Sequence, residues 1–436
     1  MNRKLLVPVV LASAASLFSV NAAAQDVLVY DDNTEDQVAQ TACTNLGYTC
    51  TVANSTNFNS LLTGSEWDLV VMDLPSTRPD GDWQGLLGAY IAGGGRVIQS
   101  GWSESDFVTL AADFEVVIAG SHQPIEIYQW NASDFFTTPN TVPSPIPVID
   151  DDWGTNGFYL NLLPAGGGVA EAGFVAAPAA DQGASISGNN GRTVFNGFLF
   201  DDFYPGGADT SGKDDIVEFI ENQMAITIEA DREPTASFWV TKTFSDGSTD
   251  DVDVNLTCTS GLPLSQDFTI AGGDPVGVRF IVTNLPEDGA NCEVTETGGP
   301  AGYTTVLNGG AGCAWTEVKY GLYICEIANL ADPATFTVYK DWVIVNDGGD
   351  AVFGEAWVTA WCDSEIVGGT FDAYSGNWYI SDYLGDGDSL VATIDTTTGP
   401  TSCRATESLA ESGVESEDDC GARSIAAGGA SSCTFT

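Results

Sequence analysis

The sequence has very little positive charge and almost no histidine. Its 436 residues include 13 lysines and arginines against 61 aspartates and glutamates, for a formal net charge of −48, and the single histidine is His122. A surface this acidic repels phosphate backbones and anionic headgroups, which argues against nucleic acid and lipid surfaces as partners. One histidine and no Cys-x-x-Cys pair also argue against a zinc site.

Long apolar runs are missing beyond the first residues. No later segment reaches about 18 uninterrupted apolar residues, so we expect no membrane span in the mature chain. Within residues 1–24, Arg3 and Lys4 precede an apolar stretch that ends in small residues near Ala24. This pattern is typical of a cleaved signal peptide and predicts a secreted, cell-surface or periplasmic protein. Ten cysteines in an exported chain predict disulfides.

Residues 26–225 alternate between strand and helix patterns, which predicts a parallel sheet with helices on both faces. The predicted strands are Val27–Tyr30, Thr49–Ala53, Trp67–Asp73, Arg96–Ser100 and Thr193–Phe200. The predicted helices are Thr34–Leu46, Trp83–Ala92 and Lys213–Met224.

The run from Leu69-Val70-Val71-Met72-Asp73 through a helix to Gly93-Gly94-Gly95 and a further strand resembles the flavodoxin-like fold of class I glutamine amidotransferase-like domains. The resemblance implies a three-layer α/β domain. It also implies a nucleophilic cysteine after the strand that ends at Ser100, and a histidine near the last strand. Here Gly101 and Trp102 follow Ser100 and His122 comes far before the last strand, so we expect this domain to be catalytically silent.

Two alternatives keep a functional site in this domain. A secreted hydrolase could use Ser103 and His122, although Gly101-Trp102-Ser103-Glu104-Ser105 lacks the last glycine of a nucleophile elbow. A ligand could instead bind at the carboxyl ends of the strands, near Asp31, Asp32 and Asp73, where α/β sheets commonly bind ligands.

After Met224 the pattern changes to short alternating strands, which predicts antiparallel immunoglobulin-like or prealbumin-like sandwiches. An internal repeat divides this half into residues 236–332 and 333–436. Ser237–Lys242 matches Thr335–Lys340, and Cys292 to Glu296 matches Cys403 to Glu407 at the same offset of four residues.

Each repeat carries four cysteines, and four cysteines allow three connectivities among which spacing alone does not choose. We expect sequential pairing within each repeat and a local bridge in the first domain. The expected pairs are Cys43–Cys50, Cys258–Cys292, Cys313–Cys325, Cys362–Cys403 and Cys420–Cys433.

Val294-Thr295-Glu296-Thr297-Gly298-Gly299-Pro300-Ala301-Gly302-Tyr303 resembles the Val-x-Glu-x-x-x-Pro-x-Gly-Tyr signature of Cna B-type (SpaA-like) sandwiches of bacterial surface proteins. The resemblance implies an internal isopeptide bond between Lys242 and Asn329, assisted by Glu296. Lys340 and Glu407 are the equivalents in the second repeat. A Lys–Glu ion pair at the sandwich edge explains the same residues without a covalent bond.

The second repeat departs from this pattern, because the equivalent of Asn329 would be position 437 and the sequence ends at Thr436. We therefore expect a shortened last strand and a further C-terminal sorting or anchoring tail in the parent protein.

Acidic turns predict weak calcium sites as a further alternative, since extracellular modules bind calcium through such loops. These turns are Asp80-Gly81-Asp82, Asp150-Asp151-Asp152, Asp246 to Asp253, and Asp386-Gly387-Asp388.

The sequence thus favours an exported bacterial structural or binding protein, engaged in adhesion or ligand display through an unknown extracellular partner. No cofactor is predicted apart from calcium. A secreted hydrolase and a calcium-dependent scaffold remain alternatives.

Overall fold

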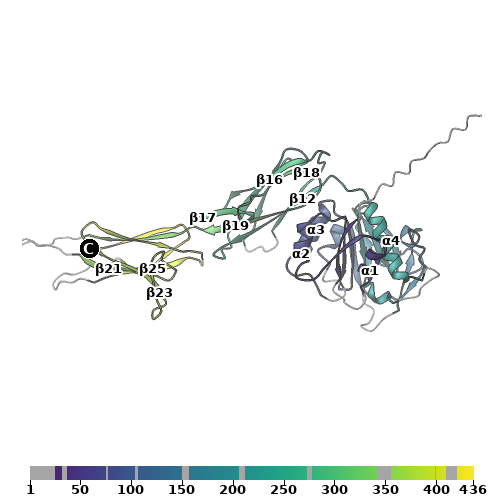
Figure 1. Cartoon of the computed structure of the whole chain (residues 1–436), viewed down its shortest axis with the longest axis horizontal. Helices are drawn as coiled ribbons and strands as arrows, with labels where there is room; N and C mark the ends of the chain where they lie inside the picture. Colours follow the sequence, from purple (N-terminus) through teal and green to yellow (C-terminus); the bar gives the residue numbers. More distant parts are fainter. Residues whose placement is uncertain are drawn as a thin grey trace, which may run out of the picture.

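The computed structural model describes residues 25–31, 37–74, 77–103, 107–149, 157–205, 212–272, 277–341, 355–397, 399–408 and 420–436. The chain is mostly β-sheet, and it runs from an N-terminal α/β unit through two successive β-sandwiches (Figure 1). The predicted signal peptide, residues 1–24, lies outside the described residues. None of the helices in the described ranges combines the length and hydropathy needed to cross a bilayer.

Five parallel strands form the centre of the N-terminal unit, in the order β2-β1-β3-β4-β11. The interior residues of β1 and most of those of β3 are apolar and buried, as expected for strands that are covered on both faces. The strands are β1 (Asp26–Asp31), β2 (Thr49–Ala53), β3 (Leu69–Leu74), β4 (Val97–Gly101) and β11 (Thr193–Asn196).

Two helices cover each face of this parallel sheet. Helices α1 (Val38–Asn45) and α4 (Asp215–Glu229) share one apolar core with the sheet, and α2 (Phe58–Gly64) and α3 (Trp83–Ala92) share the other. Helix α3 spans the predicted residues because the Asp82 side chain accepts a hydrogen bond from the Gly85 amide at its start.

The sheet continues beyond β11 into antiparallel strands that the sequence did not predict. They are β5 (Val116–His122), β6 (Glu126–Gln129), β7 (Ile146–Pro147), β8 (Gly157–Leu162), β9 (Val169–Gly173) and β10 (Gly183–Gly188). The predicted last strand was too long at its C-terminal end. It stops at Asn196, after which Phe198 forms only an isolated bridge with Gly157, and Phe198 and Phe200 pack into a buried aromatic cluster.

The first sandwich consists of two four-stranded sheets, β15-β12-β19-β17 and β14-β13-β16-β18. Side chains from both sheets meet in one apolar core that also contains Cys292, Cys313 and Cys325. The strands are β12 (Ala236–Phe244), β13 (Val252–Cys258), β14 (Ser265–Ile270), β15 (Val278–Val282), β16 (Ala290–Gly298), β17 (Tyr303–Leu307), β18 (Ala314–Val318) and β19 (Gly321–Ala331).

The second sandwich pairs a three-stranded sheet, β24-β20-β27, with a five-stranded sheet, β22-β23-β21-β25-β26. It encloses a second apolar core. The strands are β20 (Ala334–Lys340), β21 (Ala356–Cys362), β22 (Thr370–Asp372), β23 (Asn377–Leu384), β24 (Ser389–Ile394), β25 (Thr401–Ser408), β26 (Arg423–Ile425) and β27 (Ala430–Phe435).

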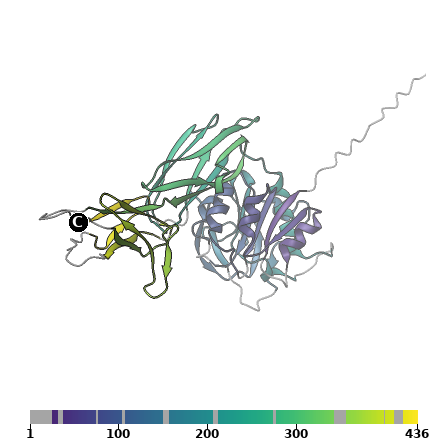
Figure 2. The same ribbon diagram turned by 60° about the vertical axis from the view of Figure 1, so that its left-hand side comes forward.

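Helix α3 docks against the first sandwich, and Figure 2 shows that sandwich beside the N-terminal unit. A Cβ atom on Gly85 would lie 2.8 Å from the Trp239 ring, so the absence of a side chain permits this approach. The Gly321 amide donates a hydrogen bond to the Gly93 carbonyl (2.8 Å), and Arg279 forms an ion pair with Asp113 at 3.3 Å.

Candidate functional site

All ten cysteines are paired in the structure, as Cys43–Cys50, Cys258–Cys292, Cys313–Cys325, Cys362–Cys403 and Cys420–Cys433. In each sandwich one disulfide joins neighbouring strands of one sheet: Cys258–Cys292 joins β13 to β16, and Cys362–Cys403 joins β21 to β25. The other two bridges end on β19 and β27, the last strand of each sandwich. Each sandwich is therefore closed covalently at two places.

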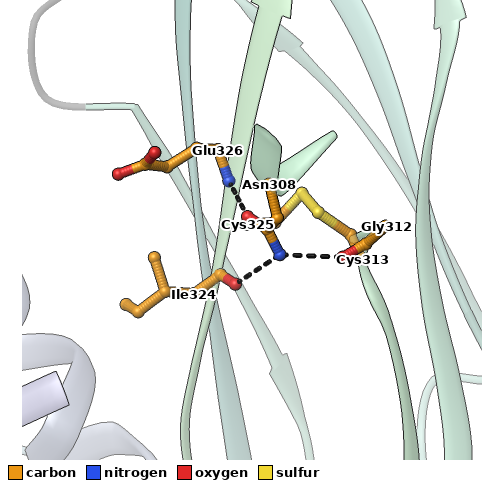
Figure 3. Close-up of a disulfide and its surroundings, with 6 residues drawn as sticks. All are labelled: Asn308, Gly312, Cys313, Ile324, Cys325 and Glu326. Atoms are coloured by element: carbon orange, nitrogen blue, oxygen red, sulfur yellow. Dashed lines mark hydrogen bonds between the residues drawn. A yellow bond between two sulfur atoms is a disulfide. The ribbon is translucent and has the colours of Figure 1, made fainter. Parts of the chain in front are cut away.

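The Cys313–Cys325 bridge is held by the turn beside it (Figure 3). The Asn308 side chain donates a hydrogen bond to the Gly312 carbonyl (2.8 Å) and accepts one from the Glu326 amide (2.7 Å). Because these contacts reach both the turn and β19, one asparagine connects the two ends of the bridge.

Two of the three predicted residues, Glu296 and Asn329, are in contact in the first sandwich. Lys242 and Asn329 lie on the neighbouring parallel strands β12 and β19, with Lys242 opposite Ile327 and two positions before Asn329. Glu296 faces them from β16 in the other sheet. The Asn329 amide donates to Glu296 Oε1 at 3.4 Å, and Thr305 donates to Glu296 Oε2 at 2.9 Å.

The Asn329 amide and the Lys242 amine differ in their exposure to solvent. Asn329 is 1% exposed, and its side-chain oxygen has no hydrogen-bond partner within the described part of the chain. The Lys242 amine instead lies at the sandwich edge, where it donates to the carbonyls of Asp250 and Ile270. Burial lowers the Lys242 pKa below its usual value, although Asp251, Asp250 and Glu296 oppose this effect. The Lys242 amine thus lies at the edge of the sandwich, whereas the Asn329 amide lies in its interior.

The second sandwich contains a buried Lys–Glu ion pair, whereas the alternative to a covalent bond placed such a pair at the edge of a sandwich. Lys340 Nζ lies 3.1 Å from Glu407 Oε1, and both side chains are 1% exposed. Lys340 pairs with Phe435 on β27 just as Lys242 pairs with Ile327 on β19. The equivalence of the two lysines, inferred from the repeat, therefore holds in strand register.

The structure does not bring Ser103 and His122 into a catalytic arrangement. The His122 ring, at the end of β5, stacks on Tyr159 at 4.2 Å between centroids and contacts Phe174 at 4.4 Å. Burial lowers the His122 pKa, and the imidazole forms no hydrogen bond with any residue that the structure describes. Ser103 follows β4, and Glu104 and Ser105 lie outside the described residues.

The carboxyl ends of the parallel strands bring together part of the predicted acidic ligand site. Asp31 on β1 is directly opposite Asp73 on β3, and Asp73 is buried. Asp32 lies outside the described residues.

The acidic turns use their carboxylates as local hydrogen-bond acceptors. Asp82 caps α3, Asp246 accepts from Tyr303, and Asp251 accepts from the Gly272 amide. Asp388 accepts from the Gly385 amide, while residues 150–152 lie outside the described ranges. Across the residues described, no group of three or more His, Cys, Asp or Glu side chains could hold a metal ion.

Two residues that surround Lys242 and Glu296 were not predicted from the sequence. Thr305 contacts Glu296 from β17, and the Phe244 ring lies 4.8 Å from the Lys242 amine. Phe244 was detectable, because residues two apart on a strand share a face. The contact of Thr305 with Glu296 could not be predicted in this way, because it depends on which strands lie side by side in the fold.

Comparisons with known proteins identify no family for this chain. No family model matches, and no curated protein matches. Among solved structures, a protein described as a GMP synthase subunit, from Thermoplasma acidophilum, is 15% identical over 47% of this chain and 96% of its own, with a TM-score of 0.32.

Two surface proteins also match. The major pilin of Streptococcus pyogenes is 11% identical over 47% of this chain and 96% of its own, with a TM-score of 0.20. Two B repeat units of the collagen binding protein of Staphylococcus aureus are 12% identical over 57% of this chain and 53% of their own, with a TM-score of 0.23. TM-scores of this size do not establish a shared fold.

Proposed function

We propose that this chain is an exported bacterial structural and binding protein, in which two disulfide-bonded sandwiches form a stalk that carries the N-terminal α/β unit. The observation that carries the proposal is the pairing of all ten cysteines within their own units. Disulfides of this kind form in oxidising compartments and persist there. Adhesion or display of an extracellular ligand is the role that such a stalk serves, on the cell surface or in the medium.

Domain boundaries at residues 26–225, 236–332 and 333–436 belong to this proposal. We assign the N-terminal unit to the flavodoxin-like class, because its parallel strands follow the order β2-β1-β3-β4-β11 with two helices on each face. It acts as a non-catalytic head. Ser100, the last residue before the position where the amidotransferase-like resemblance would place the nucleophile, is buried and donates to the Phe198 carbonyl at 2.9 Å.

Export can be tested with the full chain and a variant that lacks residues 2–24, both expressed in a laboratory bacterium. We expect the full chain outside the cytosol, with a new N-terminus near Gln25 and no free thiols. The shortened chain should stay in the cytosol with reduced cysteines. Equal distribution of the two chains between compartments would contradict the proposed signal peptide.

The first sandwich is also proposed to form an isopeptide bond between Lys242 and Asn329. Neutral Lys242 Nζ would attack Asn329 Cγ, and the bond from Cγ to the amide nitrogen would break. The amine proton would pass through the Glu296 carboxyl group to the leaving nitrogen, which departs as ammonia. Support comes from the position of Lys242 and Asn329 on the neighbouring strands β12 and β19, from the contact of Asn329 with Glu296, and from the burial of Asn329.

Intact-mass measurement after disulfide reduction tests this bond. We expect the mature chain to be lighter than its sequence mass by one ammonia, and Glu296→Gln to have the full mass. Glu293→Gln is a matched control, because Glu293 is exposed on the same strand. A wild-type chain of full mass would contradict the isopeptide bond and leave the proposed export unaffected.

A further inference from the structure

The outer face of the five-stranded sheet in the second sandwich carries two aromatic rows. Trp357 on β21 pairs with Tyr383 on β23, with ring centroids 4.5 Å apart. Four residues along the same strand, Trp361 pairs with Tyr379 at 4.9 Å. At about 3.3 Å per residue, the two rows are about 13 Å apart along β21.

These rings lie on the surface and not in the core. Trp357 is 39% exposed and Tyr383 is 57% exposed, whereas their strand neighbours Ala356 and Leu384 are buried. Large aromatic side chains left in water are costly, so paired aromatic rows on an open face indicate a contact surface.

A row of hydroxyl side chains lies between the aromatic rows. Thr359 is itself buried, and it pairs with Ser381 on one side and with the exposed Thr406 on the other. Ser408, which is also exposed, continues the Trp357 row on β25. The Ser381, Thr406 and Ser408 hydroxyls form no side-chain hydrogen bond within the described part of the chain. The face therefore alternates flat apolar surfaces with groups that can donate and accept hydrogen bonds.

The first sandwich shows that the fold does not require aromatic residues here. Strand β13 is the repeat equivalent of β21, and its outward residues are Asp253, Asn255 and Thr257 where β21 has Trp357, Thr359 and Trp361. Both sandwiches keep the in-sheet disulfide at the end of this strand. The aromatic rows are thus an added feature of the second sandwich.

Charge narrows the choice of partner. The three rows contain no acidic side chain, although the chain as a whole has 61 acidic residues. Arg404 ends the Trp361 row, is exposed, and forms no ion pair with any described residue. The rows therefore contain no carboxylate that could pair with a basic protein. Aromatic rings beside hydroxyl groups are suited instead to binding a neutral ligand.

We propose that this face binds a neutral polysaccharide of pyranose rings. A pyranose presents an apolar face of C–H groups that stacks on an aromatic ring, and equatorial hydroxyls that bond to serine, threonine and arginine at the ring edges. The aromatic rows would hold two separated sugars of one chain, with the hydroxyl row beneath the sugars between them. This inference deepens the proposed extracellular binding role and rests on it for access to surface glycans.

The test is retention of the full oxidised chain on insoluble cellulose, chitin and starch. We expect retention on at least one of these neutral glycans, unchanged in about 1 M NaCl, where the Debye length is about 3 Å. Trp357→Ala and Trp361→Ala should each weaken binding about tenfold or more, and Trp361→Phe should keep most of it. Thermal melting of each variant identifies any loss of fold.

The matched control is Thr257→Ala, which changes the equivalent outward position of the first sandwich and should bind like the wild type. Three results would overturn the proposal: no retention on any of the three glycans, retention that does not respond to the tryptophan changes, or tryptophan-dependent dimerisation in sedimentation experiments. A chain that is exported and fully oxidised but binds no glycan would contradict this proposal alone.

Discussion

At the scale of single residues, the two repeats place their equivalent lysines in different surroundings. Lys242 places its amine at the sandwich edge against backbone carbonyls, whereas Lys340 is buried against Glu407. A buried ion pair contributes little net stability relative to an apolar pair, but either charge left alone inside the core is costly. The repeat pattern predicted both lysines and both acids. It did not predict which lysine is buried, because this depends on how the neighbouring loops close over the strand.

Removing one partner of the buried pair should therefore be damaging. We expect Lys340→Met to lower the free energy of unfolding by about 3–5 kcal/mol, because Glu407 then stays buried without its cation. The double variant Lys340→Met/Glu407→Leu should recover most of this loss. Urea denaturation of the full chain, followed by tryptophan fluorescence, measures both effects.

Lys319→Met is the control, since Lys319 is an exposed lysine and its loss should change stability by less than about 0.5 kcal/mol. A Lys340→Met chain as stable as the Lys319→Met chain would show that the pair is not buried in solution.

The only histidine of the chain allows a direct test of its surroundings. Burial against Tyr159 and Phe174 lowers the pKa of His122, so the unfolded chain binds a proton at higher pH than the folded chain does. The stability that neutral His122 contributes is therefore complete above about pH 6.5 and is lost as the pH falls through the unfolded and then the folded pKa.

Nuclear magnetic resonance of histidine-labelled protein gives one imidazole signal to titrate. We expect its midpoint below about 6.5 in the native chain and near 6.5 in urea. His122→Phe should reduce the loss of thermal stability in this pH range. A native midpoint at or above the unfolded one would place His122 in an open or acidic environment instead.

At the scale of elements, strong patterns were predictable and weak ones were not. Helix α3 and strand β2 were predicted with the bounds they have, because capping residues and β-branched runs marked them. Strand β10 reads Gly-Ala-Ser-Ile-Ser-Gly, and all six residues are buried. Such a strand has neither alternation nor strand-forming composition, so only its tertiary partners reveal it.

The contact of α3 with the first sandwich could not be predicted from the sequence either. Gly93 looked like an ordinary helix stop, yet a Cβ at this position would lie 2.3 Å from the Gly321 carbonyl oxygen. Its φ of −77° suits alanine, so space is the only obstacle to a side chain.

We expect Gly93→Ala to loosen the head from the first sandwich at a cost of about 1–3 kcal/mol. Limited proteolysis between residues 230 and 235, together with thermal melting, should detect the change. Gly64→Ala is the matched control, because nothing lies within 4 Å of its Cβ position. Equal protease sensitivity of the two variants would mean that the close approach of Gly93 and Gly321 does not hold the units together.

At the scale of the whole molecule, the chain combines a docked head, two covalently closed sandwiches and a strongly acidic surface. The two sandwiches are also in contact where they join, at Asp332. The Asp332 amide donates a hydrogen bond to the Gly302 carbonyl, and the Asp332 carbonyl accepts one from the Gly428 amide, both at 2.8 Å. The first sandwich therefore contacts both of its neighbours along the chain. High net charge of one sign keeps such proteins soluble and separate.

The most direct test of the account is the location and thiol state of the protein in the cells that produce it. Thiols should be blocked with an alkylating reagent before lysis, and the protein recovered from medium, surface and cytosol should be examined by mass spectrometry. We predict mature protein outside the cytosol with all five disulfides formed. Protein found in the cytosol with its ten cysteines alkylated would contradict the extracellular stalk on which the proposed function rests.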